Sequence, residues 1–349
     1  MEGAAAPPFY QIPLFFAAQR ISLPLRGVLR YPLSVRNGGE RPDGETRRFH
    51  SLYRRTGDFS GQRPAESGGQ MTITKTVVYK ESGGVSLSAD VYLPSGERRA
   101  PSPVWFYTHG GGWVGGDRSE PTLCARLCDR LLADGVAVVS IQYRLCTGGV
   151  TFPAPVDDCA DALRYFAAHA EEYLFDLSRT MTGGISAGGH LALMLAFAAE
   201  HFGETRGVYP RLPKIRCVAD LCGPTDLEKN LCVREQKGLM MCYDGLLGAD
   251  RSRWEELYAS ASPITYLKAL PVHAPLPAVI AVHGQMDPLV DRQQPLLVGE
   301  EYARRGAAFE LIPVANGNHS FGQVKNCPPP DITFADIQDR LYRFISDRL

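Results

Sequence analysis

The sequence has no long hydrophobic run and almost no net charge. No stretch of about 18 apolar residues occurs, which argues against a transmembrane helix. The 37 Lys and Arg residues nearly balance the 38 Asp and Glu residues, so the formal net charge is −1. Without an excess of positive charge, the chain has no general attraction for nucleic acid or for an acidic membrane surface. We therefore expect no nucleic-acid partner and no transmembrane segment, and the sequence is compatible with a homodimer.

The nine cysteines lack the spacing of a metal site. Cys124 and Cys128 lie four positions apart, and no Cys-x-x-Cys pair is followed by a second Cys or His pair at zinc spacing. Nine is an odd number, and scattered thiols of this kind are typical of small buried side chains in a reducing compartment. We therefore expect no bound metal and a cytoplasmic location.

Residues 1–70 differ in composition from the rest of the chain. They contain ten Arg, no Lys and six acidic residues, with frequent Pro, Gly and Ser and no sustained hydrophobic period. The apolar stretch 12–18 contains a proline and follows no basic segment, which argues against a secretory signal. An organelle transit peptide is the alternative for an Arg-rich leader, although the acidic residues argue against it. We predict a disordered extension over 1–70 and a catalytic domain over 71–349, with Met71 a candidate for the natural start.

From Thr72 onward, the pattern predicts buried strands that alternate with helices. β-Branched and apolar runs indicate strands, and apolar residues at steps of three or four indicate helices. The predicted strands are 72–79, 85–93, 103–108, 135–143, 179–184, 215–221, 278–283 and 309–313. The predicted helices are 121–133, one that begins at Pro155, 187–199, 295–305 and 334–348. This alternation predicts an α/β fold with a mostly parallel sheet that helices cover on both faces.

A Gly-x-Ser-x-Gly motif lies between a predicted strand and a predicted helix. It reads Gly184-Ile185-Ser186-Ala187-Gly188. A nucleophile must project from a tight strand-to-helix turn, and the flanking glycines let that backbone approach its neighbours without a Cβ clash. The N-terminus of the following helix adds free N–H groups and partial positive charge, which favour an oxyanion. The five-residue pattern also occurs by chance in Gly-rich proteins, but its position after a strand makes Ser186 the predicted nucleophile.

A His-Gly-Gly-Gly-Trp run follows the third predicted strand. The run is either a flexible loop or an oxyanion hole. In the second interpretation, Gly111 and Gly112 turn backbone N–H groups toward the substrate oxygen, and the N–H of Ala187 joins them. His109 then braces the loop, and Trp113 either lines the substrate pocket or belongs to the core.

The base and the carboxylate that a serine nucleophile needs are predicted in loops that follow two later strands. In hydrolases with such a motif, the order along the chain is Ser, then Asp or Glu, then His. Asp287 follows the strand 278–283, and His319 lies in a Gly/Asn-rich loop after the strand 309–313. Catalytic groups collect at the carboxyl ends of strands in open α/β sheets. We therefore predict a triad of Ser186, Asp287 and His319, which requires no metal and no organic cofactor.

Other acidic and histidine residues fit these roles less well. Asp291 is the alternative carboxylate. His283 precedes the loop of the predicted acid and is interpreted as its support. Five further histidines lie in the leader, on predicted helices or in a proline-rich connector, and they are His50, His169, His190, His201 and His273.

The ordered set of motifs resembles the hormone-sensitive-lipase-like and feruloyl/acetyl-xylan-esterase-like branches of the α/β-hydrolases. The likeness covers about residues 72–349. By first residue, its motifs are His-Gly-Gly-Gly-Trp at 109, Tyr-Arg-Leu at 143, Pro-Val-Asp-Asp at 155, Gly-Ile-Ser-Ala-Gly-Gly-His-Leu-Ala at 184, Ala-Ser-Pro-Ile at 261 and His-Gly-Gln-Met-Asp at 283. The resemblance implies the α/β-hydrolase fold with an eight-stranded sheet and an acyl-serine mechanism.

Two features depart from that family pattern. The family usually has Asp before the Tyr-Arg pair, and Gln142 stands there in this chain, which is expected to loosen a structural contact. Lipase-like members also carry a cap of amphipathic N-terminal helices, and residues 1–70 show no such pattern, so the esterase branch is favoured.

An insertion over 222–262 is predicted to form a small lid that sets substrate shape. Alternatively, its apolar residues simply complete the core.

The motifs together predict a serine hydrolase that cleaves carboxylic esters of small molecules. Short acyl chains are favoured because no long apolar lid helix is evident. Three other functions stay open: an arylformamidase or small-peptide hydrolase with the same triad, a ligand-binding pseudoenzyme on the same fold, and a purely structural protein. Ester and amide cleavage share the oxyanion and acyl-serine steps, so the sequence does not separate them. A pseudoenzyme is expected to lack a triad residue, and all three are present here.

Overall fold

The computed structural model describes residues 72–119, 124–230 and 237–349. The predicted extension over 1–70 therefore lies outside the described residues. Over the three described ranges, no helix has both the length and the hydropathy that a membrane span requires.

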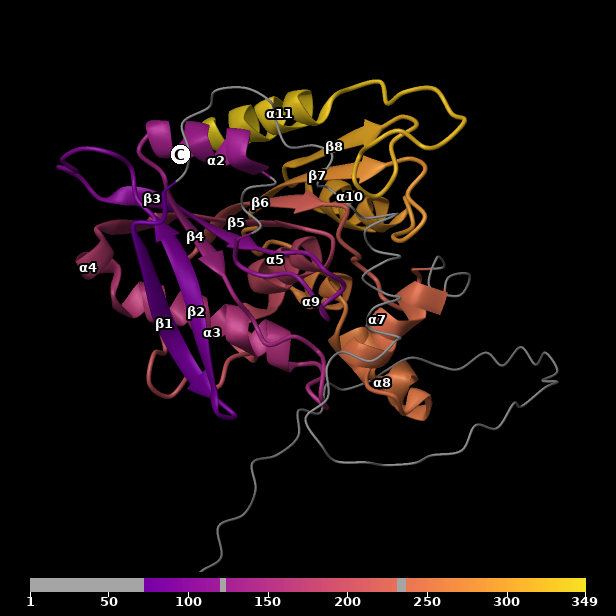
Figure 1. The fold of residues 1–349 in the computed structure, drawn as a ribbon, viewed down its shortest axis with the longest axis horizontal. Coiled ribbons are helices and arrows are strands. Elements are labelled where there is room, and N and C mark those ends of the chain that lie inside the picture. The colour runs from indigo at the N-terminus through magenta and orange to yellow at the C-terminus, as the bar shows by residue number, and fades with distance from the viewer. Residues whose placement is uncertain (1–71, 120–123, 231–236) are drawn as a thin grey trace, which may run out of the picture. The chain divides into compact units, whose positions relative to one another are not determined.

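Eight strands form a single sheet in the described part of the chain (Figure 1). They are β1 (Lys75–Ser82), β2 (Val85–Tyr92), β3 (Ser102–Thr108), β4 (Ala137–Ile141), β5 (Phe175–Ile185), β6 (Ile215–Leu221), β7 (Ala278–Gly284) and β8 (Phe309–Val314). Their order across the sheet is β1-β2-β4-β3-β5-β6-β7-β8. The β1–β2 and β2–β4 pairs are antiparallel, and every other pair is parallel. The predicted α/β fold with a mostly parallel, eight-stranded sheet is confirmed.

Helices cover both faces of this sheet (Figure 1). On one face lie α2 (Ala125–Ala133) and α11 (Phe334–Ser346), which contact each other. On the other lie α3 (Ala154–Ala168), α5 (Ala187–Ala198), α9 (Pro263–Ala269) and α10 (Gln294–Arg305). The remaining helical elements are α4 (Ala170–Tyr173), η3 (Ala199–His201), α7 (Lys237–Leu247), η4 (Arg251–Arg253) and α8 (Trp254–Ser260).

Strand β3 shows why the sequences of the central strands are almost continuously apolar. Val104 and Phe106 belong to the hydrophobic cluster on the side of α3 and α5, whereas Trp105 and Tyr107 belong to the cluster on the side of α2 and α11. Every residue of β3 is buried. Since alternate side chains enter two covered faces, both positions of the repeat must be apolar. Full burial of one such side chain contributes roughly 1.5–3 kcal/mol to folding.

The predicted insertion over 222–262 contains α7 and α8. Tyr243, Leu246 and Trp254 from this segment are buried in the cluster that also holds α3 and α5. These apolar side chains therefore help to complete the core, which is one of the two roles expected for them. The lid role stays a prediction.

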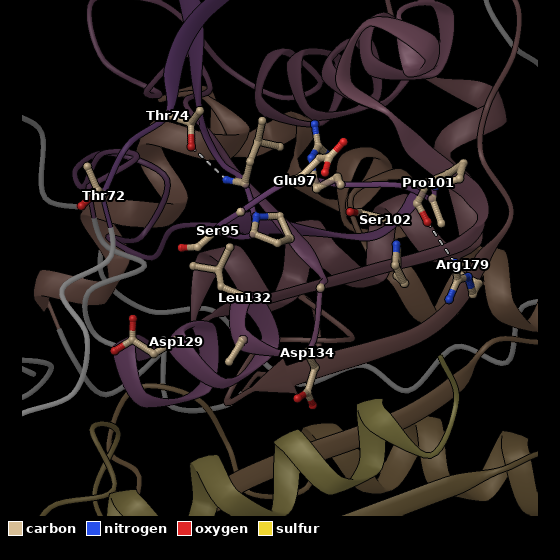
Figure 2. Close-up of a pocket in the computed structure, with 18 residues that line it drawn as sticks. Thr72, Thr74, Ser95, Glu97, Pro101, Ser102, Asp129, Leu132, Asp134 and Arg179 are labelled. Carbon is tan, nitrogen blue, oxygen red and sulfur yellow. Dashed lines mark hydrogen bonds between the residues drawn. The ribbon is translucent and has the colours of Figure 1, made fainter.

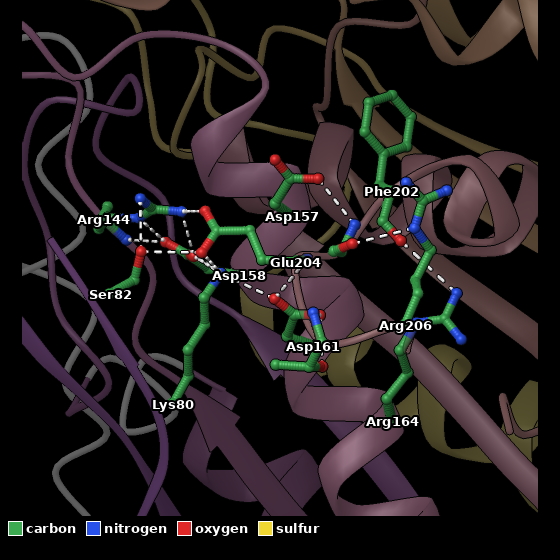
Figure 3. Close-up of polar contacts among 12 residues, drawn as sticks. Lys80, Ser82, Arg144, Asp157, Asp158, Asp161, Arg164, Phe202, Glu204 and Arg206 are labelled. Carbon is green, nitrogen blue, oxygen red and sulfur yellow. Dashed lines mark hydrogen bonds and ion pairs between the residues drawn. The ribbon is translucent and has the colours of Figure 1, made fainter. Parts of the chain in front are cut away.

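A buried ion cluster ties β1 to α3 (Figure 3). Lys80 Nζ lies 2.7 Å from a carboxylate oxygen of Asp158, 2.7 Å from one of Asp161 and 3.1 Å from one of Glu204. Arg144 adds contacts of 2.7 Å to Asp158 and 2.5 Å to Glu204. The side chains of Lys80, Asp158 and Asp161 are at most 2% exposed. Because desolvation of a charge is expensive, each buried carboxylate here needs the cation that faces it.

The side chain of Gln142, the residue before the Tyr-Arg pair, makes two hydrogen bonds in the structure. Its Oε1 accepts the Arg118 N–H at 3.1 Å, and its Nε2 donates to the Tyr143 carbonyl at 3.1 Å. The amide thus holds both the loop that follows the glycine-rich run and the backbone after β4.

Candidate active site

Ser186 occupies a strained turn between β5 and α5. Its φ is 56° and its ψ is −120°, a conformation that residues other than glycine rarely adopt. A Cβ on Gly184 or on Gly188 would collide with the carbonyl oxygen of Thr108 at the end of β3. The two glycines of the motif are therefore required by the close approach of this turn to β3.

Ser186, His319 and Asp287 form a continuous hydrogen-bonded chain. His319 Nε2 lies 2.9 Å from Ser186 Oγ, and His319 Nδ1 lies 2.7 Å from Asp287 Oδ2. An ionised carboxylate only accepts hydrogen bonds, so Nδ1 carries the ring proton and donates it to Asp287. Nε2 is then left to accept from the Ser186 hydroxyl. This arrangement places a base within reach of a nucleophile and a carboxylate behind the base.

Parallel strands bring the three side chains to one edge of the sheet. Ser186 follows β5, Asp287 follows β7 and His319 follows β8, so each lies beyond the carboxyl end of a strand. The loops after β7 and β8 also contact each other, since the Met286 N–H donates to the Gly317 carbonyl at 2.9 Å. The acid and the base therefore lie on two loops that are directly joined.

The Gly/Asn-rich composition of the loop after β8 has a structural reason. Asn318 Oδ1 accepts the N–H groups of Ser320 and Gly322, both at 2.9 Å. A short amide side chain that binds nearby backbone in this way stabilises a turn. The turn is built around His319.

Asp287 is held as a carboxylate by its neighbours. Its Oδ1 accepts the N–H groups of Leu289 at 2.8 Å and Val290 at 3.0 Å. Its Oδ2 binds His319 and lies 3.4 Å from His283 Nε2. Burial by itself raises the pKa of Asp287, but the charge of His319 and the hydrogen bonds from His283 and His319 outweigh it. The pKa of Asp287 consequently lies well below its ordinary value, so the group stays ionised.

Two other candidates from the sequence have supporting positions. Asp291 Oδ1 accepts the Gln293 N–H at 2.9 Å and has no hydrogen bond with His319 among the described contacts. His283 Nε2 hydrogen-bonds the Val290 carbonyl at 2.9 Å, so it braces the loop that carries the acid. The structure thus brings Asp287, and not Asp291, to His319.

The glycine-rich loop and the start of α5 present backbone N–H groups that have no hydrogen-bond partner among the described residues. These are the N–H groups of Gly111 and Gly112 in the loop and of Ala187 in the helix. Gly111 has a φ of 105°, and a Cβ there would collide with the Gly115 carbonyl, so only glycine fits. Ala187 is the first residue of α5, where an N–H has no partner within the helix. The three donors are available to a substrate oxygen, and their role as an oxyanion hole stays a prediction.

Two buried histidines brace that loop and the helix α5. The ring of His109 stacks on Tyr143 with centroids 4.1 Å apart, and its Nδ1 bonds the next carbonyl at 2.8 Å. His190 accepts from Trp113 Nε1 at 3.2 Å and donates from Nε2 to the Ala261 carbonyl at 2.7 Å. Burial lowers the pKa of both histidines to about 4, so both are neutral at physiological pH. Trp113 is buried, which is the core position that the sequence left open, and its contact with substrate stays a prediction.

Cys222 lies beside the triad, and no sequence motif pointed to it. Its Sγ is 4.0 Å from His319 Nε2, and its S–H donates to the His319 carbonyl at 3.3 Å. The residue follows the last residue of β6 and is 1% exposed. Burial raises the pKa of the Cys222 thiol well above its ordinary value, so the thiol is neutral. Only the order of the strands, with β6 between β5 and β7, indicates that the residue after β6 lies near the triad.

A separate hollow of about 1150 Å³ lies away from the triad (Figure 2). It is lined by Ser102 and Pro103 at the start of β3, Gly135 before β4, and Arg179 of β5. These residues lie at the amino ends of the parallel strands, whereas Ser186 lies beyond a carboxyl end. The hollow is therefore no part of the candidate active site.

The chain matches one protein family model and parts of several curated relatives. The BD-FAE family model matches residues 89–301, a range that contains Ser186 and Asp287 but ends before His319. The non-reducing polyketide synthase Preu6 of Preussia isomera is 31% identical over 179 residues, which are 48% of this chain and 8% of the synthase. The versiconal hemiacetal acetate esterase of Dothistroma septosporum is 38% identical over 107 residues, 30% of this chain and 31% of that esterase. The matches thus span less than a third of either relative.

Solved structures of esterases share the fold. The propionate-bound esterase Est2 of Thermogutta terrifontis superposes with a TM-score of 0.63 at 20% identity, over 80% of this chain and 95% of that one. A truncated carbohydrate esterase from gut microbiota has a TM-score of 0.63 at 21% identity, over 81% of this chain and 99% of that one. At this level of identity, the likeness establishes the common architecture.

Proposed function

Since this chain belongs to the BD-FAE family of α/β-hydrolase esterases, we propose that it is a serine hydrolase that cleaves carboxylic esters. The observation that carries the proposal is the hydrogen-bonded chain from Ser186 through His319 to Asp287. The unpartnered N–H groups beside it supply the second element that acyl transfer needs, a place for a negative oxygen.

The first half of the proposed reaction forms an acyl-serine. His319 Nε2 takes the proton of Ser186 while Oγ attacks the ester carbonyl carbon. The carbonyl oxygen becomes negative and accepts hydrogen bonds from the glycine-rich loop and from the start of α5. Asp287 stabilises the imidazolium that forms, because it is ionised and bound to Nδ1. The intermediate then expels the alcohol, which leaves with the proton from Nε2.

The second half releases the acid. A water molecule attacks the acyl carbon, and His319 Nε2 accepts its proton. The tetrahedral intermediate uses the same N–H donors, and its collapse breaks the bond to Ser186 Oγ. Nε2 returns the proton to that oxygen, so the starting state is restored without a metal or an organic cofactor.

We assign short acyl groups to the substrate. The matched relative from Dothistroma septosporum is named for an acetate ester, and Est2 of Thermogutta terrifontis was captured with propionate and with butyrate. The odd number and scattered positions of the nine cysteines favour a reducing, cytoplasmic setting for the reaction.

The test is hydrolysis of p-nitrophenyl acetate, butyrate and octanoate, together with labelling by a fluorophosphonate probe. The wild type is compared with Ser186→Ala. We expect labelling that depends on Ser186 and the fastest turnover on acetate or butyrate. Full hydrolytic activity in Ser186→Ala would show that the nucleophile is wrong.

Two other outcomes lead to different functions. Labelling of Ser186 without ester turnover would indicate an amide substrate, and formamides and short peptides would be assayed next. No labelling at all would favour a ligand-binding protein on this fold, despite the complete set of three side chains.

A further inference from the structure

One group of metal-ligating side chains is found over residues 72–119, 124–230 and 237–349, and it includes two members of the candidate triad. Donor atoms of Cys222, Asp287 and His319 all lie within 4.8 Å of one another. The proposed hydrolysis uses Asp287 and His319, but it contains no step for Cys222. A buried thiol next to the general base therefore has no assigned role.

The distance between the thiol and the imidazole suits one ion that binds both. Zinc lies about 2.3 Å from a cysteine sulfur and about 2.0–2.1 Å from a histidine nitrogen. Cys222 Sγ and His319 Nε2 are 4.0 Å apart, so a single ion reaches both atoms with a bent sulfur–metal–nitrogen angle. Ser186 Oγ lies 2.9 Å from the same nitrogen and can supply an oxygen ligand.

Asp287 adds a second observation in favour of a metal ligand at His319. Its carboxylate binds Nδ1 at 2.7 Å, which fixes the tautomer and leaves the lone pair on Nε2. Zinc-bound histidines commonly have this carboxylate behind them, because it orients the ring and raises its basicity. The hydrogen bond that prepares His319 for catalysis thus also prepares it to bind a metal.

We propose that Cys222 and His319 bind a zinc-like divalent cation, and that the bound ion inhibits the hydrolase. A thiolate with an imidazole selects zinc or cadmium over magnesium and calcium, which prefer oxygen ligands. Binding replaces the S–H bond of Cys222 by a metal–sulfur bond and releases one proton to solvent, without any change of oxidation state. The ion then occupies the Nε2 lone pair that would accept the Ser186 proton.

The ion site is tested by binding before activity is considered. Cadmium is titrated into the full chain, and the ultraviolet absorption of the cadmium–thiolate bond is followed. Cys222→Ala is compared with the wild type and with Cys217→Ala, a matched control because Cys217 is also buried at a position on β6. We expect Cys222→Ala to lose one equivalent of cadmium–thiolate absorption, whereas Cys217→Ala and Ser186→Ala keep it.

Inhibition is tested with zinc in the p-nitrophenyl acetate assay, each variant being measured against its own metal-free rate. The inhibitory effect rests on the proposed function, whereas the binding does not. We expect Cys222→Ala to raise the zinc concentration for half-inhibition by about tenfold or more, since loss even of an outer-shell partner commonly weakens metal binding by that factor. Cys217→Ala is expected to be inhibited like the wild type, and magnesium is expected to have no effect.

The outcomes separate the two proposals. Equal cadmium absorption in Cys222→Ala and the wild type overturns the ion site, and equal inhibition of the two by zinc overturns the inhibitory role of that site. Loss of that absorption in a protein without hydrolytic activity supports the ion site while the proposed function fails. If circular dichroism shows that Cys222→Ala does not fold, Cys222→Ser replaces it, because serine keeps the size of the side chain and removes the thiolate ligand.

Discussion

The candidate triad and the ion cluster around Lys80 both bury a carboxylate, but they give it different partners. Asp287 faces His319, whose other ring nitrogen accepts the hydroxyl of Ser186. Asp158 faces Lys80 and Arg144, whose side chains are donors only and stay charged at neutral pH. An imidazole can accept a proton and pass it on to a substrate, whereas the two cations can only hold the chain together.

The ion cluster also explains two motifs that carry the family resemblance. The segments 143–145 and 155–158 supply Arg144 and Asp158, which bind each other, and Asp158 also binds Lys80 of β1. These two motifs therefore stabilise the fold, whereas the motifs around Ser186 supply the residues of the proposed reaction. Substitutions in the two regions should separate loss of stability from loss of activity.

The largest expected effect is on activity, from Asp287→Asn. An amide no longer requires the Nδ1 proton of His319, so the ring loses the tautomer that accepts from the serine. We expect kcat for p-nitrophenyl acetate to fall by about 10⁴-fold, with a small change in the thermal unfolding midpoint. Asp291→Asn is the matched control on the same loop, and kcat similar to the wild type is expected. A larger fall in kcat in Asp291→Asn than in Asp287→Asn would show that Asp291 is the catalytic carboxylate.

Next in size is a loss of stability from Lys80→Met. The substitution leaves Asp161 buried without the cation that faces it, and removal of one partner of a buried ion pair costs about 3–5 kcal/mol. The free energy of unfolding is measured by urea denaturation, and kcat is expressed per folded molecule. Lys75→Met is the control on the same strand, because Lys75 pairs with Glu172 at the surface. We expect no measurable loss of stability in this control and no loss of kcat in either variant.

The oxyanion donors are tested by Gly111→Ala. A Cβ there collides with the Gly115 carbonyl and must displace the loop, so the donors move from the substrate oxygen. Loss of one such donor typically lowers kcat by about 10²–10³-fold. Gly84→Ala is the control, since Gly84 also has a positive φ, of 76°, but an added Cβ there meets no atom within 4 Å. Equal kcat in both variants would remove the oxyanion role from this loop.

The smallest expected effect is a pH dependence of stability from the buried histidines. Burial lowers the pKa of His109 and His190 from 6.5 to about 4 in the folded chain. Between pH 6.5 and 4, the unfolded chain therefore binds more protons than the folded chain, and stability is lost as the pH falls. Each histidine contributes at most about 1.4 kcal/mol per pH unit.

His190→Gln isolates that contribution. The slope of the unfolding free energy against pH is measured for the wild type and for the variant. Burial raises the pKa of Asp157 to about 6, so this residue makes both proteins more stable as the pH falls. Because its contribution is the same in both, the difference between the two slopes reports His190. We expect a shallower loss of stability toward acid in the variant and no difference in slope above pH 7. Identical slopes over the whole range would show that His190 titrates normally in the folded chain.

The local pattern of apolar residues was sufficient to predict the strands and several of the helices. All eight strands were predicted, because continuous apolar runs and β-branched residues mark strands that are buried on both faces. The helices α7, α8 and α9 were not predicted individually. Packing of residues such as Tyr243, Trp254 and Ile264 against the core stabilises them, and α8 and α9 have only seven residues each, too few for local propensity to hold a helix.

The sequence by itself determined the turn at Ser186 and the order of the three triad residues, because both depend on residues that are near one another or that follow successive strands. Tertiary structure alone decided the contacts between distant segments. Cys222 meets His319 across 97 residues, and Trp113 meets His190 across 77. These pairs arise because the order β3-β5-β6-β7-β8 gathers the ends of these strands at one edge of the sheet. Periodicity along a chain identifies which face of a strand is buried, but the order of the strands determines which side chains meet.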